Sequence, residues 1–305
     1  MRIARFLSPL GPRLGLVVAD GQVIDLVAAA QEQRLDWFVP AAADLRLFLA
    51  GGIALRDMAS TIARRSQLPA LEMASLRLLA PFEAGSKILA HVVNYYGHDK
   101  EAKVKVPAKP FFFQKPSSSV ANPGDTIVAH SVSHKLDHEV EIGIMIGRVG
   151  RSIDAEDAFD HVAGYMVLND VSYRDFQMND GYPDLNTSYG KNWTQAKGLD
   201  AACPMGPVLV LTDELREPYP LRKQCRVNGK VRQDANSSDM IHKVPALIAE
   251  VSKGMTLWPG DVIATGTPAG GGLGDEVWLK PGDVVECEVE RLGVLRSVVA
   301  ADLSD

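Results

Sequence analysis

The chain has 305 residues, of which 46% are hydrophobic and 23% are charged, and its formal net charge is −6. These values are typical of a globular protein. Neither a block of Lys and Arg nor an apolar run of membrane-spanning length occurs, so the sequence argues against nucleic-acid and membrane partners. The widely spaced Cys203, Cys225 and Cys287 argue against a disulfide framework or a structural zinc site, and they predict reduced thiols in a cytoplasmic protein.

Residues 1–80 predict a small α+β domain. Two apolar runs, at 14–18 and 23–26, flank Asp20-Gly21, and this dipeptide is a strong signal for a hairpin. Patterns rich in Ala and Leu, with helical spacing, follow at 42–50 and 53–65. No chemical motif occurs in this part, so we expect the function to reside in the remainder of the chain.

Residues 81–305 predict a mostly β catalytic domain. Short apolar runs alternate with turns, and Pro-Gly-Asp precedes such a run at three places, where proline and glycine supply the backbone angles of a turn. The clearest helical pattern covers 239–251, with Pro245 as a kink or as the true start of the helix. Shorter helices are expected at 154–161 and 171–178. Many strands with a few covering helices predict a rolled or sandwiched sheet.

The most informative segment is an acidic strand pattern at 136–147. Alternation puts the carboxylates of Asp137, Glu139 and Glu141 on one face and mostly aliphatic side chains on the other. An edge strand with its charged face in water is the simpler interpretation. The acidic face continues as Gly143 and Met145, however, which is not typical of a solvated face. We therefore expect the carboxylates to open into a partly enclosed cavity, where their repulsion requires a cation or water.

Asp170 is a third candidate ligand because it ends an apolar run. Three carboxylates without Cys or His suit Mg²⁺, and also Mn²⁺ or Ca²⁺, better than zinc. Mg²⁺ keeps open positions at such a site, and a 2-oxo acid can occupy two of them through its carboxylate and keto oxygens. The alternative role for Asp170 is the N-cap of a helix at 171–178, which is compatible with metal binding.

Six ordered motifs resemble the fumarylacetoacetate hydrolase superfamily. They lie between residues 87 and 301 and comprise Lys87-Ile88-Leu89 with Asn94-Tyr95 and His98, and then 113–118, 136–147, 169–177, 196–200 and 265–268. Each motif is weak alone, but six in the same order are specific. The resemblance implies a mixed β-sandwich roll with α+β elements, which is usually a homodimer.

The resemblance also implies the ligand set and the water-activating pair. The metal ligands would be Glu139, Glu141 and Asp170, with Mg²⁺ as the expected cofactor. The water-activating pair would be His98 with Glu101, whose spacing places both side chains on one face of a short helix. The simpler alternative for His98 is a surface helix residue.

Further residues would stabilise charge on the substrate. By resemblance, Arg174, Gln177 and Lys197 would stabilise oxyanions, and Lys115 and Thr267 would hold a substrate carboxylate. The ordinary alternative for the first three is an ion pair between Arg174 and Asp175, with Gln177 and Lys197 in solvent.

The sequence departs from the family pattern at three places. Val92 replaces a usual glycine beside His91, and Gly271 stands where valine is common. No acid lies just before His98, so a site with three carboxylates is expected rather than one with four. These departures leave the identity of the 2-oxo acid open.

Three functions remain open at this point. The first is a metal-dependent hydrolase that cleaves a C–C bond in an acylpyruvate-type 2-oxo acid through a metal-bound enolate, and the pair of His98 with Glu101 favours it. The second is a decarboxylase, tautomerase or hydratase of a 2-oxo acid, which would use the same enolate. The third is a non-catalytic metal- or ligand-binding protein, which the retention of all the expected site residues disfavours.

Overall fold

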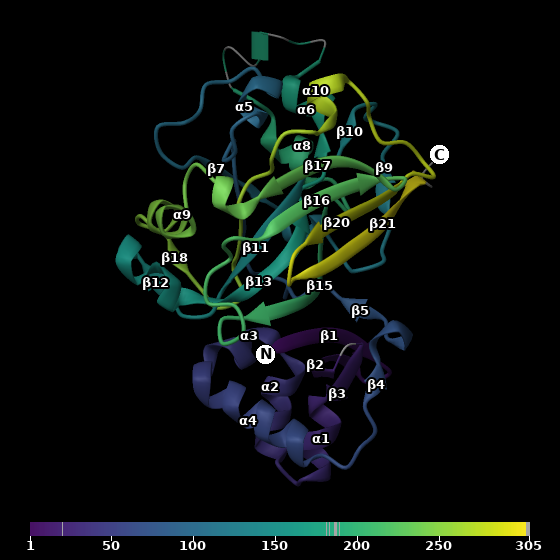
Figure 1. The fold of residues 1–305 in the computed structure, drawn as a ribbon, viewed down its shortest axis with the longest axis vertical. Helices are drawn as coiled ribbons and strands as arrows, with labels where there is room; N and C mark the ends of the chain where they lie inside the picture. The colour runs from purple at the N-terminus through teal and green to yellow at the C-terminus, as the bar shows by residue number, and fades with distance from the viewer. Residues whose placement is uncertain (20, 181, 183, 186–187, 189, 303–305) are drawn as a thin grey trace.

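The computed structural model describes residues 1–305 except 20, 181, 183, 186–187, 189 and 303–305 (Figure 1). Its largest sheet has 12 strands. The main path of this sheet runs through β4 (Leu71–Glu72), β3 (Gln22–Asp25), β2 (Gly11–Ala19), β1 (Arg2–Ser8), β15 (Cys203–Leu211), β13 (Val162–Asn169), β11 (Val140–Ile146), β19 (Val262–Ala264), β6 (Ile88–His91) and β7 (Phe112–Lys115). Two short strands lie off this path: β5 (Leu78–Leu79) pairs with β1, and β8 (Val120–Ala121) pairs with β15.

The N-terminal elements follow the predicted pattern with one difference. Strands β2 and β3 form the expected hairpin, although residue 20 of its turn lies outside the described residues. The expected helix at 42–50 is instead two helices, because the extended backbone of Asp44 interrupts it and the Asp44 side chain caps the second one at Leu47 N–H. The helices here are α1 (Leu26–Glu32), α2 (Val39–Ala43), α3 (Leu45–Ala50) and α4 (Gly52–Arg65).

The N-terminal strands join the main sheet directly. Strand β1 runs antiparallel to β15, with Arg2 opposite Val210. Elements on both sides of residue 80 therefore share one sheet, and a domain boundary at that residue stays a prediction.

A second, five-stranded sheet packs on the first. Its order is β17 (Lys230–Asn236), β16 (Arg222–Val227), β20 (Val284–Val289), β21 (Gly293–Ala301) and β9 (Ile127–Ala129). Ile142 and Ile144 of β11 share one buried cluster with Val285 and Leu295 of this sheet. The core between the two sheets confirms the predicted fold class of mostly strands in packed, mixed sheets.

Strand β11 occupies the interior of the main sheet. It lies between β13 and β19, and all seven of its residues are buried. The interpretation of this segment as a solvated edge strand is therefore wrong. The segment is also not one continuous strand, because Leu136 and Asp137 form β10 and pair separately with β14 (Ser172–Tyr173).

Three helices begin later in the chain than the sequence predicts. Pairing of β14 with β10 draws Ser172 and Tyr173 into a strand, so α6 begins only at Arg174 (Arg174–Met178) and Asp170 does not cap it. Likewise α9 (Val244–Val251) begins just before Pro245, which sits in its first turn without a kink. The expected helix at 154–161 is a 3-10 helix, Ala155–His161.

Short elements complete the described structure. They are α5 (His98–Glu101), α8 (Trp193–Gly198), α10 (Gly272–Asp275), the strand pair β12 (Gly150–Arg151) and β18 (Thr256–Leu257), and 3-10 turns at Asp36–Phe38, Met73–Ser75, Ser117–Ser119 and Ser237–Asp239. Figure 1 shows α5, α6, α8 and α10 gathered at the end of the molecule opposite α1–α4. Among the described residues, no helix combines the length and the apolar character needed to cross a bilayer.

Candidate metal centre and substrate cavity

Three carboxylates from two adjacent strands converge in the interior. Glu139 directly precedes β11, Glu141 lies within it, and Asp170 directly follows β13. Antiparallel pairing sets Val140 opposite Asn169 and so brings the three together. One ligand oxygen from each side chain lies within 4.8 Å of the others, and all three residues are buried. The pairing is reinforced where Asp170 N–H donates to the Glu139 carbonyl at 2.9 Å.

The charges at this cluster fit a divalent cation. Burial, together with the nearby carboxylates of Asp170 and Glu139, raises the pKa of Glu141 well above its ordinary value. The backbone N–H of Gly266 donates to Glu141 Oε2 at 2.7 Å. A cation would relieve the repulsion among the three carboxylates, and an all-oxygen donor set suits Mg²⁺, Mn²⁺ or Ca²⁺.

Two buried lysines hold the same carboxylates. Lys197 Nζ lies 2.6 Å from Glu139 Oε2 and 2.8 Å from Asp170 Oδ2. Lys115 Nζ donates to Asp170 Oδ1 at 2.7 Å and also to the Lys197 carbonyl. The sequence predicts Lys115 as a substrate ligand, but its side chain is fully enclosed and lies outside the cavity wall formed by the described residues. Its contacts orient Asp170 instead.

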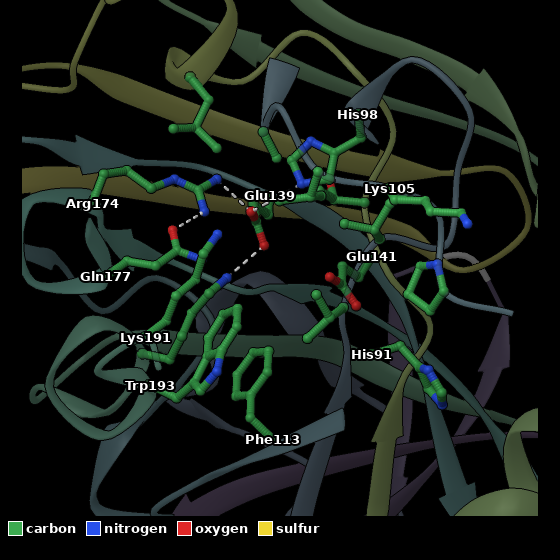
Figure 2. A pocket seen from close by; sticks show the side chains of 18 residues that line it. His91, His98, Lys105, Phe113, Glu139, Glu141, Arg174, Gln177, Lys191 and Trp193 are labelled. Carbon is green, nitrogen blue, oxygen red and sulfur yellow. Dashed lines mark hydrogen bonds and ion pairs between the residues drawn. The ribbon is translucent and has the colours of Figure 1, made fainter. Parts of the chain in front are cut away.

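Arg174 and Gln177 share the first turns of α6 and face the cluster. Arg174 Nη1 donates to Gln177 Oε1 at 2.9 Å, and Arg174 Nη2 bonds to Glu139. Against the effect of burial, the positive charges of Lys197 and Arg174 hold the pKa of Glu139 well below its ordinary value. Figure 2 shows Arg174 and Gln177 beside Glu139.

The alternative interpretations of these side chains as solvent-exposed are wrong. Gln177 and Lys197 are buried. The side chain of Asp175 accepts from Ser133 Oγ at 2.6 Å and from His134 N–H at 2.8 Å, while Arg174 pairs with other carboxylates. The sequence predicts that Arg174 lies in the site, but it does not predict that Asp137 and Glu139 are its partners.

Asp137 takes a different role from the other two acids of its segment. Its Oδ2 accepts from Arg174 Nε at 2.9 Å and its Oδ1 accepts from Gly272 N–H at 2.7 Å. A Cβ atom at Gly271 would lie 3.2 Å from Asp137 Oδ2, so the glycine leaves room for this carboxylate. The break in the strand after Asp137 turns it away from the metal cluster and toward Arg174.

His98 and Glu101 form the expected pair on α5. His98 Nδ1 lies 3.3 Å from Glu101 Oε2, and Glu101 Oε1 accepts from Gly270 N–H at 2.7 Å. His98 is buried, so the surface-helix alternative is wrong. Its second nitrogen, Nε2, lies 3.9 Å from Glu139 Oε1. His98 therefore stands at the edge of the carboxylate cluster, near Glu139 (Figure 2).

A cavity of about 150 Å³ lies between His98 and the carboxylates of Glu139 and Glu141. His98, Glu139, Glu141, Arg174, Gln177, Lys197 and Thr267 all contribute to its wall. The Thr267 hydroxyl already donates to the Val140 carbonyl at 3.1 Å and accepts from Gln233 Nε2 at 2.9 Å. Its position on the wall agrees with the prediction, while its hydrogen bonds serve the adjacent strand.

The rest of the cavity wall consists of residues for which the sequence predicts no role in the site. Phe113 and Trp193 stack with ring centroids 4.7 Å apart, and Lys105 and Lys191 add two cationic side chains. Val92, at a departure from the family pattern, also lines the cavity, and the neighbouring His91 is buried with neither ring nitrogen bonded within the described structure. These residues come from separate segments with no periodic signal in common.

A family model described as fumarylacetoacetate (FAA) hydrolase C-terminal matches residues 87–300. The chain belongs to the fumarylacetoacetate hydrolase family. Over 300 residues it is 41% identical to the human protein named oxaloacetate tautomerase FAHD2A, mitochondrial, and the match covers 97% of this chain and 90% of that protein.

Solved structures of family members share the fold. Fumarylacetoacetate hydrolase from Exiguobacterium antarcticum superposes with a TM-score of 0.79 at 33% identity, over 99% of this chain and 100% of the other. Maleylpyruvate hydrolase from Sphingobium sp. SYK-6, solved with manganese(II) and pyruvate, gives 0.78 at 30% identity, over 99% of each chain. The protein is therefore a fumarylacetoacetate hydrolase-family enzyme with a mixed-sheet fold.

Proposed function

We propose that this enzyme is a divalent-cation-dependent keto–enol tautomerase of a compact 2-oxo acid of the oxaloacetate class. The observation that carries the proposal is a small cavity lined by His98, Glu139 and Glu141, which joins the histidine–carboxylate pair to the cluster of three buried carboxylates. A tautomerase needs a site for the 2-oxo acid and one group that moves a proton. The similarity to a human protein named as an oxaloacetate tautomerase supports this choice.

The residues fit Mg²⁺, with Mn²⁺ as the alternative, held by Glu139, Glu141 and Asp170. When bound, such a cation would act as a Lewis acid toward the carboxylate and keto oxygens of the substrate. Mn²⁺ in the structure of the maleylpyruvate hydrolase supports a divalent cation in this fold. Glu141, whose pKa is raised by burial and by its acidic neighbours, gains most from a nearby positive charge.

His98 is positioned to move the proton. In the tautomer that carries its proton on Nδ1, His98 donates to Glu101, and Nε2 keeps the lone pair that can take a proton. In the enol-forming direction, Nε2 takes a proton from C3, the C3–H electron pair forms the C2=C3 double bond, the π pair of the C2=O bond moves to the oxygen, and a proton is returned to that oxygen. No atom is gained or lost overall. Gln177, whose Oε1 is occupied by Arg174, offers its amide N–H to the oxygen that becomes negative.

Hydrolysis of an acylpyruvate-type C–C bond is the second candidate. The same His98–Glu101 pair is the arrangement that activates a water molecule, and the similar structure of a maleylpyruvate hydrolase supports it. This reaction needs room for water and for the acyl half of the substrate. A cavity of about 150 Å³ favours tautomerisation, which needs room only for the 2-oxo acid itself.

The test follows the product as well as the loss of substrate. Enol oxaloacetate is mixed with the enzyme and Mg²⁺, its ultraviolet absorbance is recorded, and the products are identified by NMR beside a parallel 2,4-dioxo acid. We expect accelerated conversion to keto oxaloacetate with its four-carbon skeleton intact. His98→Asn should slow this conversion by roughly 10²–10⁴-fold. His134→Asn, at an exposed histidine, is the matched control. Cleavage of the dioxo acid without tautomerisation would establish hydrolysis instead.

Two broader assignments belong to the same proposal. We expect a homodimer, as is usual for the fold, with a small 2-oxo acid as partner rather than nucleic acid or membrane. A cytoplasmic location also stays a prediction, since the human relative is named as mitochondrial. Size-exclusion chromatography with light scattering tests the dimer.

A further inference from the structure

Lys223 is a completely buried lysine that lies outside the cavity wall. It comes from β16 in the second sheet. Its Nζ donates to the Gly266 carbonyl at 2.9 Å and lies 3.7 Å from the centre of the Tyr95 ring. Both partners are uncharged groups, whereas Lys115 and Lys197 bond to carboxylates.

Packing alone does not account for a lysine at this position. An ammonium group removed from water is strongly disfavoured unless a carboxylate neutralises it. Burial accordingly lowers the pKa of Lys223 to about 7. A methionine of similar length would fill the space without this penalty. A function other than packing is therefore needed to explain this lysine, and its hydrogen bond to the Gly266 carbonyl provides one.

Gly266 connects Lys223 to the candidate metal centre. Its carbonyl accepts from Lys223, and its N–H donates to Glu141 Oε2 at 2.7 Å. Gly266 has φ of +91°, and a Cβ atom there would lie 2.7 Å from Asn94 Cβ, so glycine is required. A glycine in this conformation rotates easily unless its peptide groups are held. The bond from Lys223 holds the carbonyl, which belongs to the peptide group that follows Gly266, and so limits the rotation at Gly266 that would move the N–H bonded to Glu141.

The neighbours of Gly266 are anchored by other residues. Asn94 Nδ2 donates to the Thr265 carbonyl at 2.8 Å, and the Thr267 hydroxyl donates to the Val140 carbonyl at 3.1 Å. The Thr265 carbonyl belongs to the same peptide group as the Gly266 N–H, so Asn94 holds that group, and Thr267 holds the end of the turn. Lys223 holds the next peptide group from the second sheet, so Gly266 is fixed on both sides.

We propose that Lys223 is a positioning residue for the metal ligand Glu141 and acts through Gly266. Either the ammonium or the neutral amine can donate the bond. The inference rests on the metal assignment under Proposed function but not on the choice between tautomerisation and hydrolysis. Outer-shell partners of this kind typically change metal affinity by roughly 10–100-fold when they are removed.

Lys223→Met tests the role, because it keeps the length of the side chain and removes the donor. Calorimetric titration with Mn²⁺ should show a dissociation constant raised about tenfold or more relative to wild type. The melting temperature of the metal-free variant should be unchanged or higher, because a buried amine is removed. At saturating Mn²⁺ the kcat should stay close to that of wild type. Loss of affinity without loss of stability distinguishes positioning from a structural role.

Tyr95→Phe is the matched control. It keeps the ring beneath Lys223 and removes a hydroxyl that has no hydrogen-bond partner within the described structure. Its Mn²⁺ affinity should equal that of wild type. An unchanged Mn²⁺ affinity in Lys223→Met would overturn the inference while leaving the metal assignment intact. A large fall in melting temperature, or failure of both Lys223→Met and Lys223→Leu to fold, would also overturn it, since Lys223 would then serve packing. Absence of Mn²⁺ binding by the wild type would overturn the metal assignment and the inference together.

Discussion

The amino group of Lys197 lies 2.6 Å from Glu139 Oε2, and both side chains are almost completely buried. The same nitrogen lies 2.8 Å from Asp170 Oδ2. One cation thus orders two of the three candidate metal ligands while it also faces the cavity. This position lets Lys197 stabilise negative charge on a substrate oxygen without a large rearrangement.

Lys197→Met should therefore separate catalysis from metal binding. Removal of a preorganised donor is expected to lower kcat by roughly 10²–10³-fold. Mn²⁺ affinity should not fall, because the variant removes a competing positive charge from Glu139 and Asp170. Steady-state kinetics and calorimetry measure the two effects, with the exposed Lys280→Met as control. Weaker Mn²⁺ binding with an unchanged kcat would contradict this assignment.

A second prediction concerns the turn that contacts Glu141. Gly266→Ala forces a side chain to within 2.7 Å of Asn94 Cβ in addition to straining a positive φ. Gly124→Ala is the matched control, since Gly124 has φ of +86° and a Cβ atom there would meet no other atom within 4 Å. We expect both variants to lose stability from backbone strain of about 1 kcal/mol or more. Gly266→Ala alone should also bind Mn²⁺ less tightly. Equal Mn²⁺ affinity in the two variants would show that the turn does not orient Glu141.

The pH dependence of stability should reveal buried His91. Burial, with a smaller contribution from His242, lowers the pKa of His91 to about 3, whereas an unfolded histidine titrates near 6.5. Above that unfolded value the neutral ring contributes its full stability. As the pH falls toward 3, the unfolded chain binds a proton that the folded chain does not, so this stability is lost.

In the variant His91→Leu, position 91 has no side chain that can bind this proton in the unfolded chain. The free energy of unfolding of wild type minus that of His91→Leu should fall by up to about 1.4 kcal/mol for each pH unit below 6. Urea unfolding at pH 7 and pH 5 measures the difference. His134→Leu, at an exposed histidine, is the matched control. A pH-independent difference for His91→Leu would show that folding does not lower the pKa of the ring.

Sequence patterns and the family resemblance together singled out the three candidate ligands. Alternation along 136–147 placed Glu139 and Glu141 together, and the end of an apolar run singled out Asp170. The i, i+3 spacing of His98 and Glu101 likewise predicted a pair that α5 forms. For the two glutamates and for the pair on α5, a local period fixes the direction of the side chain.

Other features depend on contacts that no local period encodes. Asp137 left the expected face because its segment pairs with β14, and the same pairing delayed the start of α6. Lys115 was expected at the substrate but bonds to Asp170, 55 residues away in the chain. Lys223 reaches Gly266 from the opposite sheet, across 43 residues. The partner of a long, flexible side chain depends on which groups the tertiary structure brings near it. The roles of Lys115 and Lys223 were therefore not predictable from the spacing of residues in the sequence.

The central claim is that three buried carboxylates hold a divalent cation, and Glu141→Gln tests it most directly. This change keeps the shape of the side chain and removes one ligand charge. Calorimetric titration with Mn²⁺ and Mg²⁺ should show binding by wild type and by the exposed control Glu156→Gln, and a loss of affinity of at least about 100-fold in Glu141→Gln. Equal binding by all three proteins would contradict the claim.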